Sequence, residues 1–313
     1  MKRAIITGAG GFVGRHLCER LLADTDWHLV LIDHQFADNW LSQHNRVTKL
    51  TGGLQDPALL HDAFSKPCDF LFHLAAVPGG AAEQNPALSK QVNLDATLAL
   101  FERAAAQDNC PRIVFTSTIA VLGAPMPAQV DDTSPIVPAM TYGAHKAMAE
   151  LALMDLSRRG LVDSVTVRLP GIIARPLAPN GLKSAFLSNV FHLLSQQQAF
   201  VSPVSESATM WLMSVQQCAA NLAWGALLKS DKMPVSRAVT LPALRVSMKG
   251  LTDEILTQTG VSASLLSWQP EPELEAGFGA QPPLFTPAAE KAGFRHDGSI
   301  EELVRKGLSL TQR

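Results

Sequence analysis

The stretch RAIITGAGGFVG, residues 3–14, decides the fold of this chain. Its first five residues predict a strand, and a helix-like run follows as far as Leu21. Between them, glycines at 8, 11 and 14 leave room for a tight turn and for a ligand to approach the backbone closely. The start of the helix offers free N–H groups and a positive dipole end to phosphates. We therefore predict that a dinucleotide contacts Gly8, Gly10, Gly11, Phe12, Val13 and Gly14.

Similar short apolar runs recur along the chain, and helix-like stretches separate them. They lie at residues 28–33, 46–50, 69–74, 112–117, 164–169 and 237–241. Most are continuously apolar, which is typical of parallel strands that are covered on both faces. The alternation with helices predicts an α/β fold, a Rossmann-type doubly wound parallel sheet of about seven strands.

The second predicted strand ends at Asp33. A carboxylate at this position of a dinucleotide-binding fold accepts hydrogen bonds from the adenosine ribose hydroxyls, and it repels a 2′-phosphate. The following residues, His34 and Gln35, include no arginine that would bind such a phosphate. The sequence therefore favours NAD over NADP as the cofactor.

The composition of the sequence changes after about residue 170, where proline becomes frequent and the regular spacing of predicted strands and helices is lost. We therefore expect an NAD-binding domain over residues 1–170. Residues 171–313 are expected to form mostly a smaller substrate-binding lobe. One strand, at about 237–241, is expected to return to the core sheet.

Composition excludes several classes of protein. The 313 residues are 47% hydrophobic, and their formal net charge is −2 with no block of basic residues, which argues against a nucleic-acid partner. The four cysteines lie far apart, without disulfide-like or zinc-ligand spacing. No apolar run is long enough for a membrane span, and none near Met1 suits a signal peptide. We expect a soluble, cytoplasmic protein without a metal site.

Tyr142 and Lys146 form a YxxxK pattern at the start of a predicted helix, and Tyr142 is the only tyrosine of the chain. Residues four apart share a helix face, so the hydroxyl and the ammonium can point into one site. We expect the cation to lower the pKa of the phenol, which can then take a proton from a substrate alcohol. A structural tyrosine beside a solvated lysine is the alternative. Upstream, the hydroxyl cluster at 116–118 ends a strand and either holds the alcohol or caps the turn.

Two predicted helices, at about 86–107 and 142–158, are too apolar to be simple surface helices. A helix-on-helix interface between two copies would cover their apolar faces. We therefore expect a homodimer that is built on these two helices.

Taken together, these motifs resemble the extended short-chain dehydrogenase/reductase family, which includes nucleotide-sugar epimerases and dehydratases. The matching stretches are TGAGGFVG at 7–14, Asp33, HLAA at 73–76, Asn93, TSTIAVLG at 116–123 and YGAHK at 142–146. The resemblance implies Thr118, Tyr142 and Lys146 as the catalytic residues. It also implies that NAD contacts Gly53, Leu54, Leu74, Ala75, Ala76, Asn93, Tyr142, Lys146 and Pro170.

The region after the sixth strand departs from the sugar-nucleotide enzymes of that family. Gly171 stands where they carry an asparagine for the diphosphate, and Gly53 stands where they carry an aspartate for adenine. The stretch RLPGIIARP at 168–176 and the residues after it are similar to the D-erythronate dehydrogenase branch instead. This resemblance implies NAD-dependent oxidation of the C2 hydroxyl of a small sugar acid to the 2-keto acid.

A sugar acid needs a cation for its carboxylate, and Arg175 can clamp one in two hydrogen bonds. Arg168 and Arg175 can equally be structural ion-pair residues. The predicted substrate contacts are Thr118, Ile119, Tyr142, Gly171, Arg175, Asn180 and Ser184. Two other functions stay open, namely a nucleotide-sugar epimerase or dehydratase with tightly held NAD, and a non-catalytic NAD(H)-binding regulator.

Overall fold

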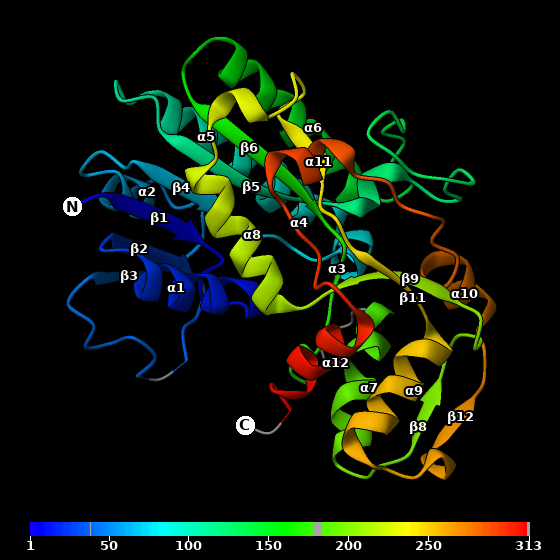
Figure 1. Ribbon diagram of the computed structural model, residues 1–313. Helices are drawn as coiled ribbons and strands as arrows, with labels where there is room; N and C mark the ends of the chain where they lie inside the picture. The colour runs from blue at the N-terminus through cyan, green and yellow to red at the C-terminus, as the bar shows by residue number, and fades with distance from the viewer. Residues whose placement is uncertain (38, 178–182, 312–313) are drawn as a thin grey trace.

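A seven-stranded parallel sheet forms the centre of this computed structural model, which describes residues 1–37, 39–177 and 183–311 (Figure 1). The strand order is β10-β6-β5-β4-β1-β2-β3, and every neighbouring pair runs parallel. The predicted doubly wound fold is thus confirmed. The strands are β1 (Arg3–Thr7), β2 (His28–Asp33), β3 (Val47–Thr51), β4 (Phe70–His73), β5 (Arg112–Thr118), β6 (Asp163–Leu169) and β10 (Ala238–Thr240).

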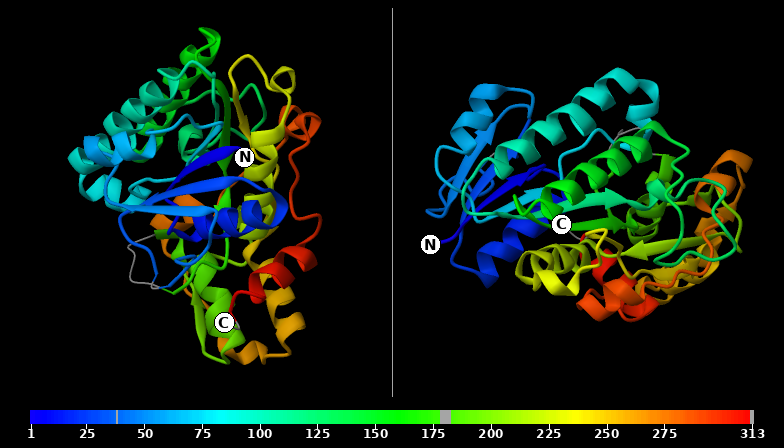
Figure 2. Two further views of the ribbon diagram at one scale, coloured as in Figure 1. Left: turned by 90° about the vertical axis from the view of Figure 1, so that its left-hand side faces the viewer. Right: turned by 90° about the horizontal axis from the view of Figure 1, so that it is seen from above.

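Helices cover both faces of this sheet, as the view from above in Figure 2 shows. On one face lie α1 (Phe12–Asp24) and α8 (Val215–Leu227), and on the other lie α5 (Ala96–Ala105) and α6 (Thr141–Arg158). Adjacent residues of one strand point to opposite faces, so Ile6 packs towards α1 while Ile5 packs towards α5. This two-sided burial explains why the strands are apolar at nearly every position.

The C-terminal part forms a second packed unit beside the carboxyl ends of the strands (Figure 1). A three-stranded sheet, β11-β9-β7, and a two-stranded sheet, β12-β8, pack against helices α7, α9 and α12. The strands are β7 (Gly171–Ile172), β8 (Phe200–Ser202), β9 (Thr209–Met213), β11 (Leu244–Ser247) and β12 (Leu266–Trp268). The helices are α7 (Phe186–Ser195), α9 (Met248–Thr259), α10 (Pro272–Phe278), α11 (Pro287–Ala292) and α12 (Ile300–Leu308). The strand expected at 237–241 is β10, which pairs with β6 of the main sheet.

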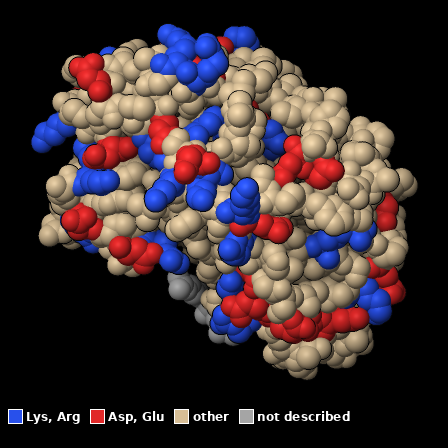
Figure 3. Space-filling view, turned by 45° about the horizontal axis from the view of Figure 1, so that its top comes forward, with Lys and Arg blue, Asp and Glu red and all other residues tan. Residues whose placement is uncertain are grey.

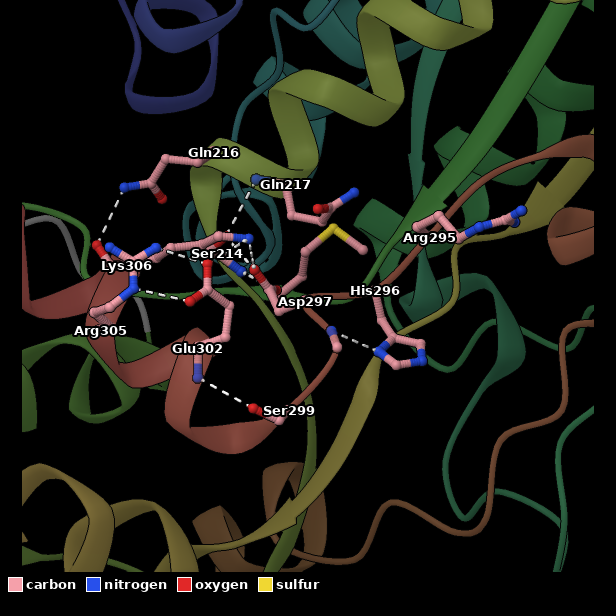
Figure 4. Close-up of polar contacts among 12 residues, drawn as sticks. Ser214, Gln216, Gln217, Arg295, His296, Asp297, Ser299, Glu302, Arg305 and Lys306 are labelled. Atoms are coloured by element: carbon pink, nitrogen blue, oxygen red, sulfur yellow. Dashed lines mark hydrogen bonds and ion pairs between the residues drawn. The ribbon is translucent and has the colours of Figure 1, made fainter.

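Asp297 ties the last helix to the rest of the molecule (Figure 4). Its buried carboxylate accepts hydrogen bonds from the backbone N–H and the hydroxyl of Ser214, at 2.9 and 2.6 Å, and forms an ion pair with Lys306 of α12 at 2.9 Å. Ser214 is also the N-cap of α8, since its hydroxyl accepts from the backbone of Gln217. One carboxylate therefore neutralises a lysine and lies at the positive end of a helix.

The single helix expected at 86–107 is divided into α4 (Pro86–Ser89), a π-helical turn η1 (Lys90–Asp95) and α5. Asn93 lies in the π-helical turn and is fully buried. Its side-chain oxygen accepts from the backbone N–H of Val77 at 2.7 Å, and its NH₂ group donates to the Val77 carbonyl at 2.9 Å. This tertiary contact holds the wider turn, and π-turns of this kind are frequent at functional sites.

Other features bear on the expected class of protein. No described helix is both long and apolar enough to span a bilayer. Within 1–37, 39–177 and 183–311, no three His, Cys, Asp or Glu side chains gather as metal ligands would. Positive and negative side chains are mixed over the face drawn in Figure 3. The four cysteines are free thiols, and three of them, Cys18, Cys68 and Cys218, are buried.

Candidate active site

The carboxyl ends of the central strands open into one cleft of about 1280 Å³. Ligands of open α/β sheets bind at this edge, where the strand order reverses; here that point lies between β1 and β4. The volume is large enough for a dinucleotide together with a small substrate. The predicted residues that line it are Gly8, Gly11, Phe12, Val13, Gly14, Asp33, Leu54, Leu74, Ala75, Ala76, Thr118, Ile119, Tyr142, Pro170, Gly171, Arg175 and Ser184.

The glycine loop after β1 brings bare backbone to the floor of this cleft. Gly8 has φ +70°, and a Cβ atom there would lie 2.7 Å from the backbone nitrogen of Ala75, so no other residue fits. Helix α1 begins at Phe12 with Gly11 as its N-cap, and no described side chain caps it. Its first N–H groups therefore face the cleft ready for a ligand with negative charge.

Asp33, at the end of β2, lies beside the glycine loop. Its Oδ2 atom accepts from the backbone N–H of Gly10 at 2.8 Å, which fixes the carboxylate beside the glycine loop. Gly10 itself does not line the cleft, so its predicted role passes through Asp33. The neighbouring residue His34 lines the cleft as well. The cradle of backbone N–H groups and the placed carboxylate fit a dinucleotide with a free ribose 2′-hydroxyl.

Besides Gly10, three more of the predicted cofactor residues do not line the cleft. Among the described residues that line it, neither Gly53, Asn93 nor Lys146 occurs, although Leu54 does. Asn93 contacts the cleft wall indirectly, because its side chain binds the backbone of Val77, which lines the cleft. Direct contact of NAD with these residues stays a prediction.

Tyr142 and Thr118 reach the cleft from two different elements. Thr118 ends β5 and is the N-cap of the short helix η2 (Ile119–Leu122), with its hydroxyl accepting from Ala120 N at 3.1 Å. Tyr142 lies in the first turn of α6. A Cβ atom on Gly143 would lie only 2.4 Å from the carbonyl oxygen of Ala120, so this glycine allows α6 to approach η2. The Tyr-Gly pair thereby brings the phenol to the threonine side of the cleft.

Lys146 lies one helical turn behind Tyr142 and is almost completely buried. Its Nζ atom donates to the carbonyl of Thr116 at 2.8 Å and lies 5.9 Å from the centre of the Tyr142 ring. Burial lowers the pKa of Lys146 to about 7, and the charge of Glu150 opposes that shift. A lysine with its pKa near neutrality is well suited to take part in proton transfer.

The phenol of Tyr142 differs from the sequence-based expectation. Burial raises its pKa to about 12, and the charge of Arg175 opposes this rise. The expected lowering by Lys146 was therefore wrong for the protein without its ligands. The loss of hydration outweighs the lysine, whose ammonium is already engaged by Thr116.

A buried ion pair links α6 to β6, and a hydrogen bond links the same carboxylate to β5. Glu150, four residues after Lys146, pairs with Arg168 of β6 at 2.8 Å and accepts from the Ser117 hydroxyl. Ser117 lies between Thr116 and Thr118 on β5, and it is paired with Arg168 across the sheet. This contact settles one open alternative, since Arg168 is a structural ion-pair residue.

Arg175 has no ion-pair partner within the described parts of the chain, and it faces the cleft. Its guanidinium lies 5.4 Å from the centre of the Phe12 ring. The preceding residue, Ala174, has φ +58°, an uncommon conformation that sets the direction of the chain at Arg175. The Arg175 carbonyl is bound by His192 of α7 at 2.8 Å. A half-buried cation without a carboxylate partner suits a negatively charged ligand.

The other predicted substrate contacts that the structure describes also line the cleft. They are Ile119, Gly171 and Ser184, and Ser184 lies in η3 (Lys183–Ala185). Asn180 lies outside the described residues. The sequence reasoning missed Ser188, Asn189 and Gln281, which also line the cleft. The polar Ser-Asn pair in the apolar run 186–194 was the available signal; Gln281 had none.

Comparisons with known proteins agree with this geometry. The model of the NAD dependent epimerase/dehydratase family matches residues 4–217. A D-erythronate dehydrogenase of Cupriavidus necator is 35% identical, and the match covers 96% of each chain. A D-erythronate dehydrogenase of Haemophilus influenzae is 34% identical over 82% of each chain.

Solved structures show the same fold over nearly the whole length. A nucleoside-diphosphate-sugar epimerase from Agrobacterium tumefaciens superposes with a TM-score of 0.90 at 31% identity, covering 98% of this chain and 94% of the other. An L-threonine dehydrogenase from Clostridium difficile has a TM-score of 0.87 at 19% identity, which is evidence for the fold alone. The protein is therefore an oxidoreductase that belongs to the NAD-dependent epimerase/dehydratase family and uses NAD as its cofactor.

Proposed function

We propose that the protein oxidises the C2 hydroxyl of a small sugar acid such as D-erythronate, with NAD⁺ as the oxidant. The observation that carries the proposal is Arg175, a cation without an ion-pair partner among the described residues, in the same cleft as Tyr142. The similarity to two D-erythronate dehydrogenases supports it. The reaction converts the 2-hydroxy acid and NAD⁺ to the 2-keto acid, NADH and a proton.

The residues of the cleft divide this chemistry among them. NAD⁺, when bound, accepts the hydride that leaves C2. Tyr142 is the base that takes the hydroxyl proton after releasing its own, and the charge of Arg175 favours that release. Lys146, whose pKa is lowered to about 7, takes part in passing the released proton to solvent. Thr118 holds the substrate hydroxyl beside the phenol. The helix start at Phe12 would hold the pyrophosphate of the cofactor, and the carboxylate of Asp33 would hold its adenosine ribose.

Arg175 orients the acid in this proposal. Two parallel hydrogen bonds between a guanidinium and a carboxylate fix both the distance and the direction of the bound group. Because C2 is bonded directly to the carboxylate carbon, fixing the carboxylate also fixes C2 relative to Tyr142. Gly171 and Ile119 then shape the space around C2.

The test measures NADH formation by the purified protein with a panel of four- to six-carbon sugar acids, and conversion of UDP- and GDP-sugars by chromatography, because an epimerase releases no NADH. We expect turnover with a four-carbon sugar acid and none with the nucleotide sugars. Turnover of a nucleotide sugar without that of any sugar acid would overturn the proposal. Failure of every compound, with NAD still bound, would favour the non-catalytic regulator.

A nucleotide-sugar epimerase is the second candidate function. The observation in its favour is the 31% identity to a nucleoside-diphosphate-sugar epimerase. Against it stands Gly171, where a Cβ atom would lie only 3.0 Å from a Leu212 side-chain carbon. Little room is left at this position for the asparagine with which sugar-nucleotide enzymes of the family contact the diphosphate. Such an enzyme would also retain NAD through purification, which denaturation and absorbance would reveal.

Three wider features complete the proposal. Residues 1–170 bind NAD, residues 171–313 mostly bind the substrate, and the enzyme acts in the cytoplasm, where its free cysteines stay reduced.

Two copies pair through α4–α5 and α6, because Leu88, Met148 and Leu151 expose apolar side chains there. Light scattering should give twice the chain mass, and Leu151→Glu should shift it towards a single chain. A monomeric wild type would contradict the pairing.

A further inference from the structure

Ser188 of α7 lines the cleft and is only 5% exposed. Its hydroxyl makes no hydrogen bond to any residue that the structure describes. The hydroxyl is not among the buried side-chain atoms that lack a partner in the described structure, so it is open to the cleft. Because Ser188 lines the cleft, a bound ligand can supply the missing partner.

Ser188 belongs to a row of polar side chains on one face of the α7 region. Ser184, Ser188 and His192 are spaced four residues apart, which places them above one another. His192 binds the carbonyl of Arg175 at 2.8 Å, so this face is next to the arginine segment. Asn189 also lines the cleft, and its amide makes no hydrogen bond within the described parts of the chain.

Gln281 presents a donor from another part of the C-terminal unit. Its side-chain oxygen accepts from the backbone N–H of Trp211, while its own backbone N–H donates to the Thr209 carbonyl at 3.0 Å. A backbone N–H needs an acceptor, so this bond identifies the oxygen of the amide and leaves its NH₂ group as the free end. The NH₂ group has no partner among the described residues, although Gln281 lines the cleft. It is a donor held at a fixed place.

We propose that Ser188, Asn189 and Gln281 determine specificity by binding the C3 and C4 hydroxyls of the sugar acid whose carboxylate Arg175 holds. The inference rests on the proposed function and adds the part of the cleft that recognises a polyhydroxy chain. A hydroxyl needs both a donor and an acceptor around it. Ser188 and Asn189 supply both kinds, and Gln281 supplies a donor. Sites built to bond a hydroxyl strongly reject the analogue that lacks it.

The test compares two substrates that differ only beyond C2, D-erythronate and (2R)-2-hydroxybutanoate. The wild type should prefer D-erythronate by at least about 100-fold in kcat/KM, as the loss of two hydroxyl contacts predicts. The double variant Ser188→Ala with Asn189→Ala should reduce this preference by about 10-fold or more. Gln281→Glu keeps the acceptor for Trp211, and replaces the donor, so it should also reduce the preference while the protein stays folded.

Ser195→Ala is the matched control, because Ser195 lies on the same helix and donates to the His192 carbonyl outside the cleft lining. The Ser195→Ala variant should prefer D-erythronate over (2R)-2-hydroxybutanoate as strongly as the wild type does. The inference is wrong if 2-hydroxy acids are oxidised and neither the double variant nor Gln281→Glu changes the preference. If the wild type oxidises no 2-hydroxy acid, the proposed function itself is wrong. The failure of the inference and the failure of the proposed function therefore give different results.

Discussion

Lys146 shows, at the scale of a single residue, how burying an ionisable group lowers the stability of the fold. Its folded-state pKa of about 7 lies below the ordinary value of 10.5, so the folded protein binds fewer protons than the unfolded chain between those values. The contribution of this group to stability therefore rises with pH across that window and is lowest at or below about pH 7. A neutral side chain of similar length at this position would not lower the free energy of unfolding in this way.

We predict that Lys146→Met abolishes turnover and stabilises the fold at pH 7 by up to about 4 kcal/mol. The gain should shrink when unfolding is measured at pH 9.5, where the wild-type lysine is closer to neutral in both states. Denaturant unfolding of both proteins at the two pH values checks this. A destabilised Met variant, or a gain that does not depend on pH, would contradict the burial argument.

Asp33 carries the choice of cofactor at the same scale. The Asp33 carboxylate is bound to Gly10 N and lies beside the cleft-lining His34. We predict far better kcat/KM with NAD⁺ than with NADP⁺, because the carboxylate repels a 2′-phosphate. Asp33→Ser combined with His34→Arg should move the preference towards NADP⁺. A wild type that prefers NADP⁺ would mean that the end of β2 was misinterpreted.

Arg175 is the residue that we propose binds the substrate carboxylate. Charge-assisted hydrogen bonds contribute roughly 1.5–3 kcal/mol, so Arg175→Ala should raise KM for the sugar acid about 10–100-fold. Arg175→Lys keeps the charge without the two-pronged geometry and should recover part of the loss. Steady-state kinetics on the three proteins is the measurement. An unchanged KM in the Ala variant removes Arg175 from the substrate site.

At the scale of elements, the Asp297 contact fixes how α12 and α8 are joined (Figure 4). Removing one partner of a buried ion pair leaves the other charge without compensation. We predict that Asp297→Ala lowers the free energy of unfolding by about 3–5 kcal/mol. Glu302 is an exposed carboxylate that pairs with Arg305 and lies 3.6 Å from Lys306, so Glu302→Gln should have a much smaller effect. Equal effects of the two changes would contradict the special role of Asp297.

The elements also show what could be read from the sequence. The apolar runs predicted β1 and β2 to the residue, because strands buried on both faces admit few polar residues. The π-helical turn at Lys90–Asp95 was missed, because the contact of Asn93 with Val77 holds it, and local periodicity carries no trace of that contact. The pKa of Tyr142 was misjudged for a related reason, since burial is a property of the folded molecule.

At the scale of the whole molecule, the cleft is assembled from distant parts of the chain. Gly8, Tyr142 and Arg175 lie in or near sequence motifs, and their meeting in one cleft follows from parallel strands that share a carboxyl edge. Gln281 lies in the segment between α10 and α11, which carries no motif, and its contact with β9 places it there. The part of the cleft formed by sequence motifs was thus predictable, whereas much of the wall from the C-terminal unit was not.

The most direct test of the central claim follows a deuterium atom from C2 of the sugar acid. D-erythronate labelled at C2 should yield deuterated NADH with a slowed rate, because the C2 hydride is the one that moves. Tyr142→Phe should lower turnover by about 10²–10⁴-fold with NAD binding retained. Unlabelled NADH from the labelled acid, or near-normal turnover in the Phe variant, would contradict the account.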